Sequence, residues 1–208
     1  MDLSIIIPVH NLENFITPML VSLRLQMWND IDPNIEAEVI FVCDNCTDKT
    51  CEKIENFALP NYTVKILECD RRSCGLARNE GLEIAEGEYV WFLDGDDWLI
   101  NPRAVLMVAN TMREYDFEMM RVDYDYSSMF QFYGHPAMVW QYIYRRDLIG
   151  ETRFKEIQPD EDLYFNREIR EKLQKKELPF MSIKLYYYNY MREGSNMQQL
   201  FTKGKIDS

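Results

Sequence analysis

The feature that most constrains the fold is the alternation of strand-like and helix-like segments along the first 112 residues. Short apolar segments rich in β-branched residues predict strands at 3–9, 38–42, 62–69 and 88–93. Amphipathic segments that follow them predict helices at 17–28, 47–57, 73–86 and 101–112. This alternation favours an α/β fold with a mostly parallel central sheet and helices on both faces.

Three of the predicted helices carry start signals. Thr17 precedes Pro18 and Asn101 precedes Pro102, as expected where a capping side chain is followed by proline at the first helical position. Ser73 is a third candidate cap. These residues therefore predict where the helices begin.

The second half of the chain has a less regular pattern. We expect a strand at 137–145, a helix at 159–173 and a strand at 185–191, whereas 115–131 has no clear periodicity. The length of 208 residues and the hydrophobic fraction of 47% suit one compact α/β domain. We therefore predict a single domain 1–208, with a regular half 1–112 and a second half 113–208.

The charge of the chain narrows the classes of partner. Its formal net charge is −12, and phosphate binding in nucleic-acid recognition needs a basic surface, so we expect no nucleic-acid partner. No apolar run approaches the roughly 18–20 residues of a membrane span, and MDLSIIIPVHN lacks the pattern of a signal peptide. We expect a cytoplasmic protein with no transmembrane span.

The chain has five cysteines, and the odd number without a secretion signal predicts reduced thiols. The spacing Cys43-x-x-Cys46 is compatible with zinc, but a single pair of this kind also occurs where cysteines simply pack in a core. We favour the core interpretation.

Polar residues gather after three of the predicted strands. His10 and Asn11 follow the first strand, Asp44 and Asn45 the second, and the segment 94–97 the fourth. The carboxyl ends of parallel strands share one edge of a sheet, which is where ligands bind in such folds. We expect these residues to lie along one edge.

The segment WFLDGDDWL places three aspartates directly after a buried strand. Carboxylates repel one another and resist burial unless positive charge compensates them. Asp94-Gly95-Asp96 offers the oxygen ligands that Mg²⁺ and Mn²⁺ prefer. A solvated acidic turn around Gly95 is the alternative. The apolar strand that leads to Asp94, and the polar residues at the other strand ends, favour the metal site.

Other polar residues admit two interpretations each. Asp44 is a candidate acceptor for a base N–H, whereas Asp48 is expected to cap the next helix. Arg78 suits either contact with a phosphate or a ribose, or a surface ion pair with Glu83 or a neighbour. Glu161 and Asp162 lie at a predicted helix start, where acids also complement the helix dipole, or one of them serves as a carboxylate base.

Two further clusters are expected to be structural. The tyrosine-rich segment 186–190 is expected to pack in the core and at a sheet edge. A basic cluster is expected to be a solvated helix face, with contact to a membrane surface as the alternative. Its members are Arg167, Arg170, Lys172, Lys175 and Lys176.

Taken together, the segments LSIIIPVHN, VIFVCDNCTDKT, GLARNEGLEIAEGEYVWFLDGDDW and EDLYF resemble the family-2 glycosyltransferases. The resemblance implies a GT-A type, Rossmann-like fold in which 1–112 binds a nucleotide-sugar and 113–208 forms the acceptor side. It also implies a nucleotide-diphosphosugar donor, expected to be a UDP-sugar, a divalent cation (Mn²⁺ or Mg²⁺) and transfer with inversion at the anomeric carbon.

The resemblance also implies roles for individual residues. Asp44 is expected to bind the base, Arg78 to lie near the nucleotide, and Asp162 to be the catalytic base. Asp94 is expected near the ribose and metal, with Asp96 as the direct metal ligand. The remaining implied contacts are the first nucleotide-binding loop, Pro8, Val9, His10 and Asn11, and a possible diphosphate contact, Arg192.

The implied acceptor is a glycan or a lipid-linked molecule in surface polysaccharide or glycan synthesis, with peripheral contact at the inner face of the membrane as a possibility. Two departures bear on specificity. Cys43 replaces the first residue of an acidic pair, and Tyr142 stands where a lysine is common. A non-catalytic nucleotide-sugar-binding relative and a sugar-nucleotide pyrophosphorylase are the alternatives, although the latter should carry a glycine-rich loop at 8–11.

Overall fold

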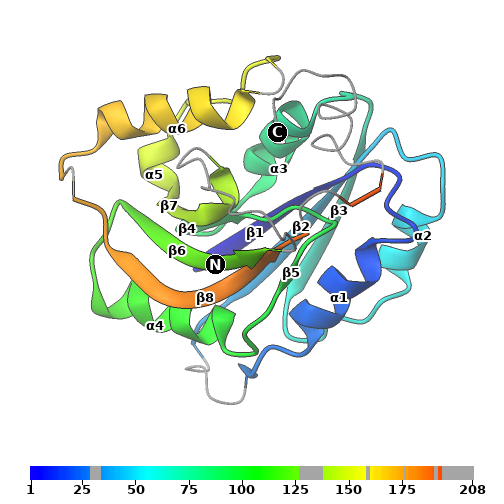
Figure 1. Ribbon diagram of the computed structural model, residues 1–208, viewed down its shortest axis with the longest axis horizontal. Helices are drawn as coiled ribbons and strands as arrows, with labels where there is room; N and C mark the ends of the chain where they lie inside the picture. The colour runs from blue at the N-terminus through cyan, green and yellow to red at the C-terminus, as the bar shows by residue number, and fades with distance from the viewer. Residues whose placement is uncertain (29–33, 127–137, 158–159, 176, 190–191, 194–208) are drawn as a thin grey trace.

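The computed structural model describes residues 1–28, 34–126, 138–157, 160–175, 177–189 and 192–193. These residues form an eight-stranded sheet with the order β3-β2-β1-β4-β7-β6-β8-β5 (Figure 1). The strands are β1 Leu3–Val9, β2 Ala37–Asp44, β3 Thr63–Cys69, β4 Tyr89–Phe92, β5 Trp98–Leu99, β6 Met119–Tyr126, β7 Tyr142–Arg145 and β8 Phe180–Tyr188.

Helices connect and cover these strands. They are α1 Ile16–Arg24, α2 Thr50–Glu55, α3 Cys74–Ile84, α4 Ala104–Glu114, α5 Arg146–Ile149 and α6 Glu161–Lys172, together with the 3₁₀ helix η2 Val139–Gln141.

The predicted fold class is confirmed. The strands β3, β2, β1 and β4 pair in parallel, with Val9 opposite Cys43 at the carboxyl end of β1. Strand β7 is antiparallel to β4 and β6, β6 is parallel to β8, and β5 is antiparallel to β8. The second half of the chain therefore extends the sheet that the first half begins.

The strands alternate their side chains between two apolar layers, as a sheet covered on both faces requires. Along β1, Ile5 and Ile7 face one layer and Ile6 faces the other. The first layer is completed by α1, α2 and α4, and the second by α3, α5 and α6, which lie on opposite sides of the sheet in Figure 1.

Of the four predicted helix caps, those at Thr17, Asn101 and Asp48 are wrong in detail. Helix α2 has no side-chain cap, although Asp48 Oδ1 accepts a hydrogen bond from the Thr50 N–H at 3.0 Å. Helix α1 begins at Ile16, one residue before Thr17, and α4 begins at Ala104, after Asn101; neither has a side-chain cap. Asn101 instead accepts a hydrogen bond from the Arg103 backbone N–H at 2.9 Å in the preceding turn. The Ser73 cap of α3 is confirmed, because its side chain accepts from the Leu76 N–H.

The second half contains a strand that the sequence pattern did not predict. Strand β6 covers residues 119–126, and β8 begins at residue 180 rather than 185. Both strands carry charged and partly exposed residues among the apolar ones, which blurs the two-residue period. The predicted strand at 137–145 is a 3₁₀ turn followed by the short β7, and residue 137 lies outside the described residues.

The described members of the basic cluster are exposed, as predicted for a solvated helix face, and two of them also contact neighbouring elements. Arg167 pairs with Glu171 on the surface of α6, at 3.5 Å. Arg170 Nη2 donates to the buried Tyr142 hydroxyl at 2.9 Å, and Lys172 Nζ donates to the Ile149 carbonyl at 2.9 Å. These two side chains tie α6 to its neighbours, while Lys176 lies outside the described residues. Across the described part of the chain, helices fall short of the length and apolarity that spanning a bilayer requires.

Candidate active site

The loops that follow β1 and β2 are joined at the carboxyl edge of the sheet. His10 Nδ1 lies 2.7 Å from the Asp44 carbonyl oxygen, and Asn11 Oδ1 accepts from the Thr47 N–H at 2.8 Å. Asn11 and Asn45 have positive φ angles of 50° and 49°, which asparagine tolerates better than most residues. The predicted neighbours 8–11 and 44–45 therefore lie together.

The acidic segment after β4 packs against the end of β1, and Gly95 makes this possible. A Cβ at this position would lie 2.7 Å from Val9 Cγ1 and 2.8 Å from Leu12 Cδ1, so a larger residue would force these side chains to move. The glycine therefore lets the backbone between Asp94 and Asp96 approach the first nucleotide-binding loop predicted from the sequence.

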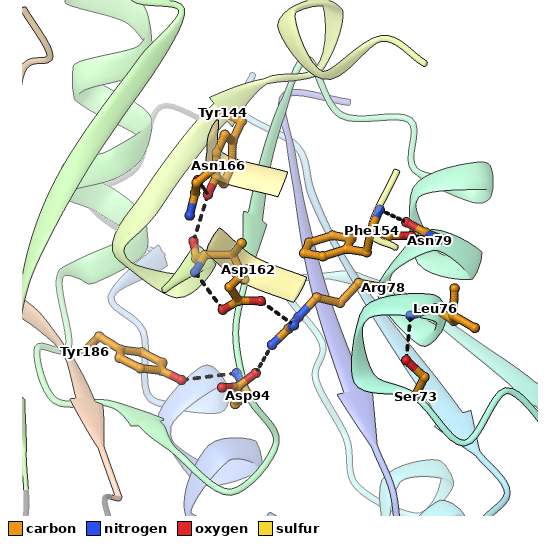
Figure 2. A network of polar contacts seen from close by, with 11 residues as sticks. Ser73, Leu76, Arg78, Asn79, Asp94, Tyr144, Phe154, Asp162, Asn166 and Tyr186 are labelled. Carbon is orange, nitrogen blue, oxygen red and sulfur yellow. Dashed lines mark hydrogen bonds and ion pairs between the residues drawn. The ribbon is translucent and has the colours of Figure 1, made fainter. Parts of the chain in front are cut away.

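Arg78 joins two of the predicted site carboxylates. Its Nη2 lies 2.6 Å from Asp94 Oδ1 and its Nη1 lies 2.9 Å from Asp162 Oδ1 (Figure 2). The Arg78 side chain is 3% exposed, and its planar guanidinium can bind two carboxylates at once. The sequence placed Arg78 near the nucleotide, and the structure places it between the candidate metal ligand and the candidate base.

The neighbouring Asn79 fixes the segment that lies beside Arg78. Asn79 Nδ2 donates to the Phe154 carbonyl at 2.9 Å, and its Oδ1 accepts from the Phe154 N–H at 2.9 Å (Figure 2). The Phe154 ring lies 5.4 Å from the Arg78 guanidinium carbon, a cation–π contact. Adjacent residues of α3 thus orient the arginine and its aromatic neighbour.

Asp162 is held on both carboxylate oxygens. Oδ1 faces Arg78, and Oδ2 accepts from the Val139 N–H at 3.0 Å. Burial raises the pKa of Asp162 above the usual range, and the positive charge of Arg78 opposes this. Tyr144 and Asn166 support the arrangement, because the Tyr144 hydroxyl lies 2.7 Å from Asn166 Oδ1 and 3.3 Å from the Val139 carbonyl.

Two buried polar atoms beside this pair have no hydrogen-bond partner among the described residues. They are Arg78 Nε and Glu161 Oε2. Burial, reinforced by the charge of Asp162, raises the pKa of Glu161 to about 7. Buried polar groups are usually hydrogen-bonded, so these atoms fit the contact of a polar ligand with the cluster.

Asp96 is paired with the predicted diphosphate contact. Arg192 Nε binds Asp96 Oδ2, and the guanidinium carbon lies 4.7 Å from the Phe15 ring centroid. Burial raises the pKa of Asp96, which Arg192 opposes and the charge of Asp94 reinforces. Arg192 therefore supplies positive charge at the carboxylate that the sequence predicts to be the direct metal ligand.

The third aspartate, Asp97, supports the acidic segment from behind. It is 1% exposed, and its carboxylate accepts hydrogen bonds from the Tyr186 hydroxyl and, at 2.7 Å, from the Asn189 N–H. The same Tyr186 oxygen accepts from the Asp94 N–H at 3.1 Å (Figure 2). Strand β8 thus fixes the turn that carries Asp94 and Asp96.

Asp44 organises the start of α3. Its Oδ1 accepts from the N–H groups of Arg71 and Arg72 at 2.6 and 2.9 Å, and its Oδ2 accepts from the Ser73 N–H at 3.0 Å. The base contact expected of Asp44 would be added to these bonds and stays a prediction. Through Ser73, which caps α3, Asp44 also positions the helix that carries Arg78.

The acidic segment fits a hard divalent cation by the chemistry of its donors. Asp94 and Asp96 offer carboxylate oxygens on a turn that is only partly buried, and each uses one oxygen for an arginine. Mg²⁺ and Mn²⁺ take one or two such carboxylates and complete their coordination with water and phosphate oxygens.

Sequence reasoning missed several groups that shape this site. Tyr186, Asn189 and Asn79 hold the acidic turn and α3, and the Val139 backbone holds Asp162. The tyrosine-rich segment 186–190 is expected to pack in the core and at a sheet edge, and Tyr186 is fully buried. The sequence does indicate that such a tyrosine has a polar partner, since a buried tyrosine hydroxyl usually forms a hydrogen bond.

The sequence of the chain matches the model of Glycosyl transferase family 2 over residues 4–178. The chain belongs to this family. The match includes β1 with its loop, the Asp94–Asp96 turn and α6, so the joint motifs that suggested the family are confirmed.

Similar proteins include two curated relatives. The poly(ribitol-phosphate) beta-N-acetylglucosaminyltransferase TarS of Staphylococcus aureus is 29% identical over 222 residues, covering 97% of this chain and 38% of TarS. The glycosyltransferase GlyA of Streptococcus pneumoniae is 26% identical over 224 residues, covering 93% of this chain and 31% of GlyA. The chain thus spans about a third of the length of these two relatives.

Solved structures share the fold. A crystal structure of S. aureus TarS 1–349 in complex with UDP-GlcNAc has a TM-score of 0.81 at 25% identity, covering 95% of this chain and 61% of that one. A mannosyltransferase from Pyrobaculum calidifontis in complex with GDP-Man and Mn²⁺ has a TM-score of 0.68 at 17% identity. The match covers 99% of this chain and 64% of the mannosyltransferase chain. The second likeness shows the fold alone.

Proposed function

We propose that this chain is the donor-binding and catalytic part of an inverting glycosyltransferase. It takes a nucleotide-diphosphosugar, with a UDP-sugar as the favoured donor, and transfers the sugar to a hydroxyl of a glycan or lipid-linked acceptor. The observation that carries the proposal is Arg78, which joins Asp94 to Asp162 and so brings the metal side and the base side together. The UDP-GlcNAc bound by TarS supports the choice of donor.

The proposed reaction is one displacement. The acceptor oxygen attacks the anomeric carbon, its proton passes to Asp162, and the bond from the sugar to the diphosphate oxygen breaks with its electron pair on the diphosphate. Because burial raises the pKa of Asp162, its carboxylate is a stronger proton acceptor than an exposed aspartate. Arg78 and the Val139 N–H hold the carboxylate in one orientation for this transfer.

The leaving diphosphate needs positive charge. A divalent cation held by Asp96 and Asp94 would supply it when bound. Arg192 lies at the same carboxylate and is placed to reach the diphosphate. His10, Asn11 and the Asp44 loop form the side of the edge on which we place the nucleoside.

A screen of nucleotide-sugars with Mn²⁺ tests the proposal. The temperature of thermal unfolding should rise with one class of nucleotide-sugar. That nucleotide-sugar should then be consumed when acceptor glycans or lipid-linked saccharides are added. Binding without any consumption or transfer would instead identify a non-catalytic nucleotide-sugar-binding relative. Localisation at the cytoplasmic face of the membrane is part of the same proposal and is tested by fractionation of cells expressing the chain.

A further inference from the structure

Three cysteines form a group beside the edge where β1 and β2 end, outside the acidic cluster of the candidate active site. Cys43 is the last residue of β2 but one, Cys46 follows in the loop, and Cys51 lies in the first turn of α2. Their Sγ atoms all lie within 4.8 Å of one another, and all three are free thiols.

This spacing is close to that of thiolates sharing one metal ion. A Zn–S distance of about 2.3 Å in tetrahedral geometry places bound sulfurs roughly 3.8 Å apart. The three sulfurs therefore need to approach one another by at most about 1 Å, which small rotations of the cysteine side chains provide. Three thiolates fill three tetrahedral positions and leave the fourth to water.

We propose that Cys43, Cys46 and Cys51 form a thiolate site for a soft divalent cation of the zinc class. Binding releases the thiol protons as the three sulfur–metal bonds form. The sequence alone shows only the pair Cys43-x-x-Cys46, which favours the core interpretation. The third ligand becomes visible only because α2 packs against the end of β2.

The surroundings allow an ion to enter and favour positive charge. Cys43 is buried, whereas Cys46 and Cys51 are half-buried and reachable from solvent. The carboxylates of Asp48 and Glu68 act electrostatically on Cys46 and Cys51, respectively. The site also differs in metal preference from Asp94 and Asp96, because thiolates prefer soft cations and carboxylates prefer hard ones.

An ion at this site would act on the edge of the sheet that carries the proposed donor site. Cys43 and Cys46 flank Asp44 and Asn45, so coordination would fix the turn between them. Asp44 in turn binds the backbone that begins α3. The site is thus placed to stabilise the side of the sheet edge on which we place the donor.

Titration of the reduced, metal-free protein with Co²⁺ tests the proposal. We expect one equivalent to bind with a thiolate-to-cobalt charge-transfer band, and Zn²⁺ to displace it. Cys51→Ser should weaken binding by more than the roughly 10–100-fold that loss of an outer-shell partner costs. Cys69→Ser is the matched control, because Cys69 is a free thiol on β3 outside the group, and binding should be unchanged.

A second measurement uses only the wild-type chain and so does not depend on a variant folding. Zn²⁺ should protect Cys43, Cys46 and Cys51 from alkylation, read by peptide mass spectrometry, while the labelling of Cys69 and Cys74 stays unchanged. Absence of a thiolate-to-cobalt charge-transfer band in the folded wild-type protein, or an unchanged Co²⁺ affinity in folded Cys51→Ser, would overturn the proposal and leave the cysteines as core residues.

Discussion

Arg78 Nη1 and Asp162 Oδ1 lie 2.9 Å apart although 84 residues separate them in the sequence. The pair links α3, from the first half of the chain, to α6, from the second. Both side chains are buried, and Arg78 also reaches Asp94. One arginine therefore sets the relative position of the two groups to which we assign base and metal chemistry.

Asp162→Asn should reduce transfer by at least about 100-fold while donor affinity stays near that of the wild type. The amide keeps the shape of the side chain but cannot accept the acceptor proton at neutral pH. Turnover with donor and acceptor, together with calorimetric donor binding, measures the two effects.

Glu161→Gln is the matched control for this substitution, because the two carboxylates are adjacent on α6. It should retain transfer within about tenfold of the wild type. If Glu161→Gln loses turnover and Asp162→Asn keeps it, the base is Glu161 and our assignment is wrong.

Arg78→Ala should lower the free energy of unfolding by about 3–5 kcal/mol, because it leaves the buried Asp162 carboxylate and the partly buried Asp94 carboxylate without their counter-charge. Arg78→Lys should fall between Ala and the wild type, since one ammonium cannot bind both carboxylates in the geometry of the guanidinium. Urea unfolding measures both.

Arg71→Ala provides the comparison for a surface ion pair. Arg71 pairs with Glu80 and its side chain is 53% exposed, so its loss should cost less than about 1 kcal/mol. Equal costs for Arg71→Ala and Arg78→Ala would contradict a special role for the buried arginine.

Asp96→Asn should abolish the Mn²⁺-dependent part of nucleotide binding, because a carboxamide is a much weaker ligand for a hard cation. Calorimetry of UDP binding with and without Mn²⁺ measures it. Asp116→Asn, at an 89% exposed carboxylate, is the control and should bind as the wild type does. An unchanged affinity for Asp96→Asn would exclude this residue as a metal ligand.

Arg192→Ala separates two roles of the arginine at Asp96. If Arg192 competes with the cation for this carboxylate and then binds the diphosphate, its removal should tighten Mn²⁺ binding to the free protein and weaken UDP binding in the presence of Mn²⁺. Titrating the metal and the nucleotide separately measures the two effects. A weakened affinity for both would mean that Arg192 mainly holds the site together.

Glu161 should make stability fall as pH rises. Its pKa is about 7 in the folded chain against the usual 4.5, so the folded state holds the proton more tightly than the unfolded state does. The stabilisation from protonation is complete below pH 4.5 and is lost as pH rises through about 7. Glu161→Gln should remove this loss and exceed the wild-type stability at pH 8 by up to about 3 kcal/mol.

Urea unfolding at several pH values, without nucleotide or divalent cation, measures this difference. Glu156→Gln, at an exposed carboxylate of the preceding loop, should follow the wild type at every pH. If the free energy of unfolding of Glu161→Gln changes with pH in the same way as that of the wild type, the pKa of Glu161 is not raised in the folded protein.

The regular first half of the fold was predictable, because each element there has a complete local pattern. Strands such as β1 are apolar on both faces, and Ser73 caps α3 as its side chain suggests. Strand β6 was not predictable, because its outer residues mix charged and aromatic side chains. Its strand conformation depends on pairing with β7 and β8.

The candidate site divides in the same way. The sequence placed Asp94 and Asp96 at a strand end, and it placed Asp162 at a helix start. It did not reveal that Tyr186 and Asp97 support the acidic turn, because that contact spans 89 residues and depends on how β8 enters the sheet.

By itself the sequence determined the alternation of elements, the edge at which polar residues gather, and the family, because these depend on local periodicity and on short motifs. Only the tertiary structure decided which polar side chains meet. Arg78 meets Asp94 and Asp162, Arg192 meets Asp96, and three cysteines lie together. Such pairings are set by how elements that are distant in the sequence pack against the sheet and against one another, which no local pattern encodes.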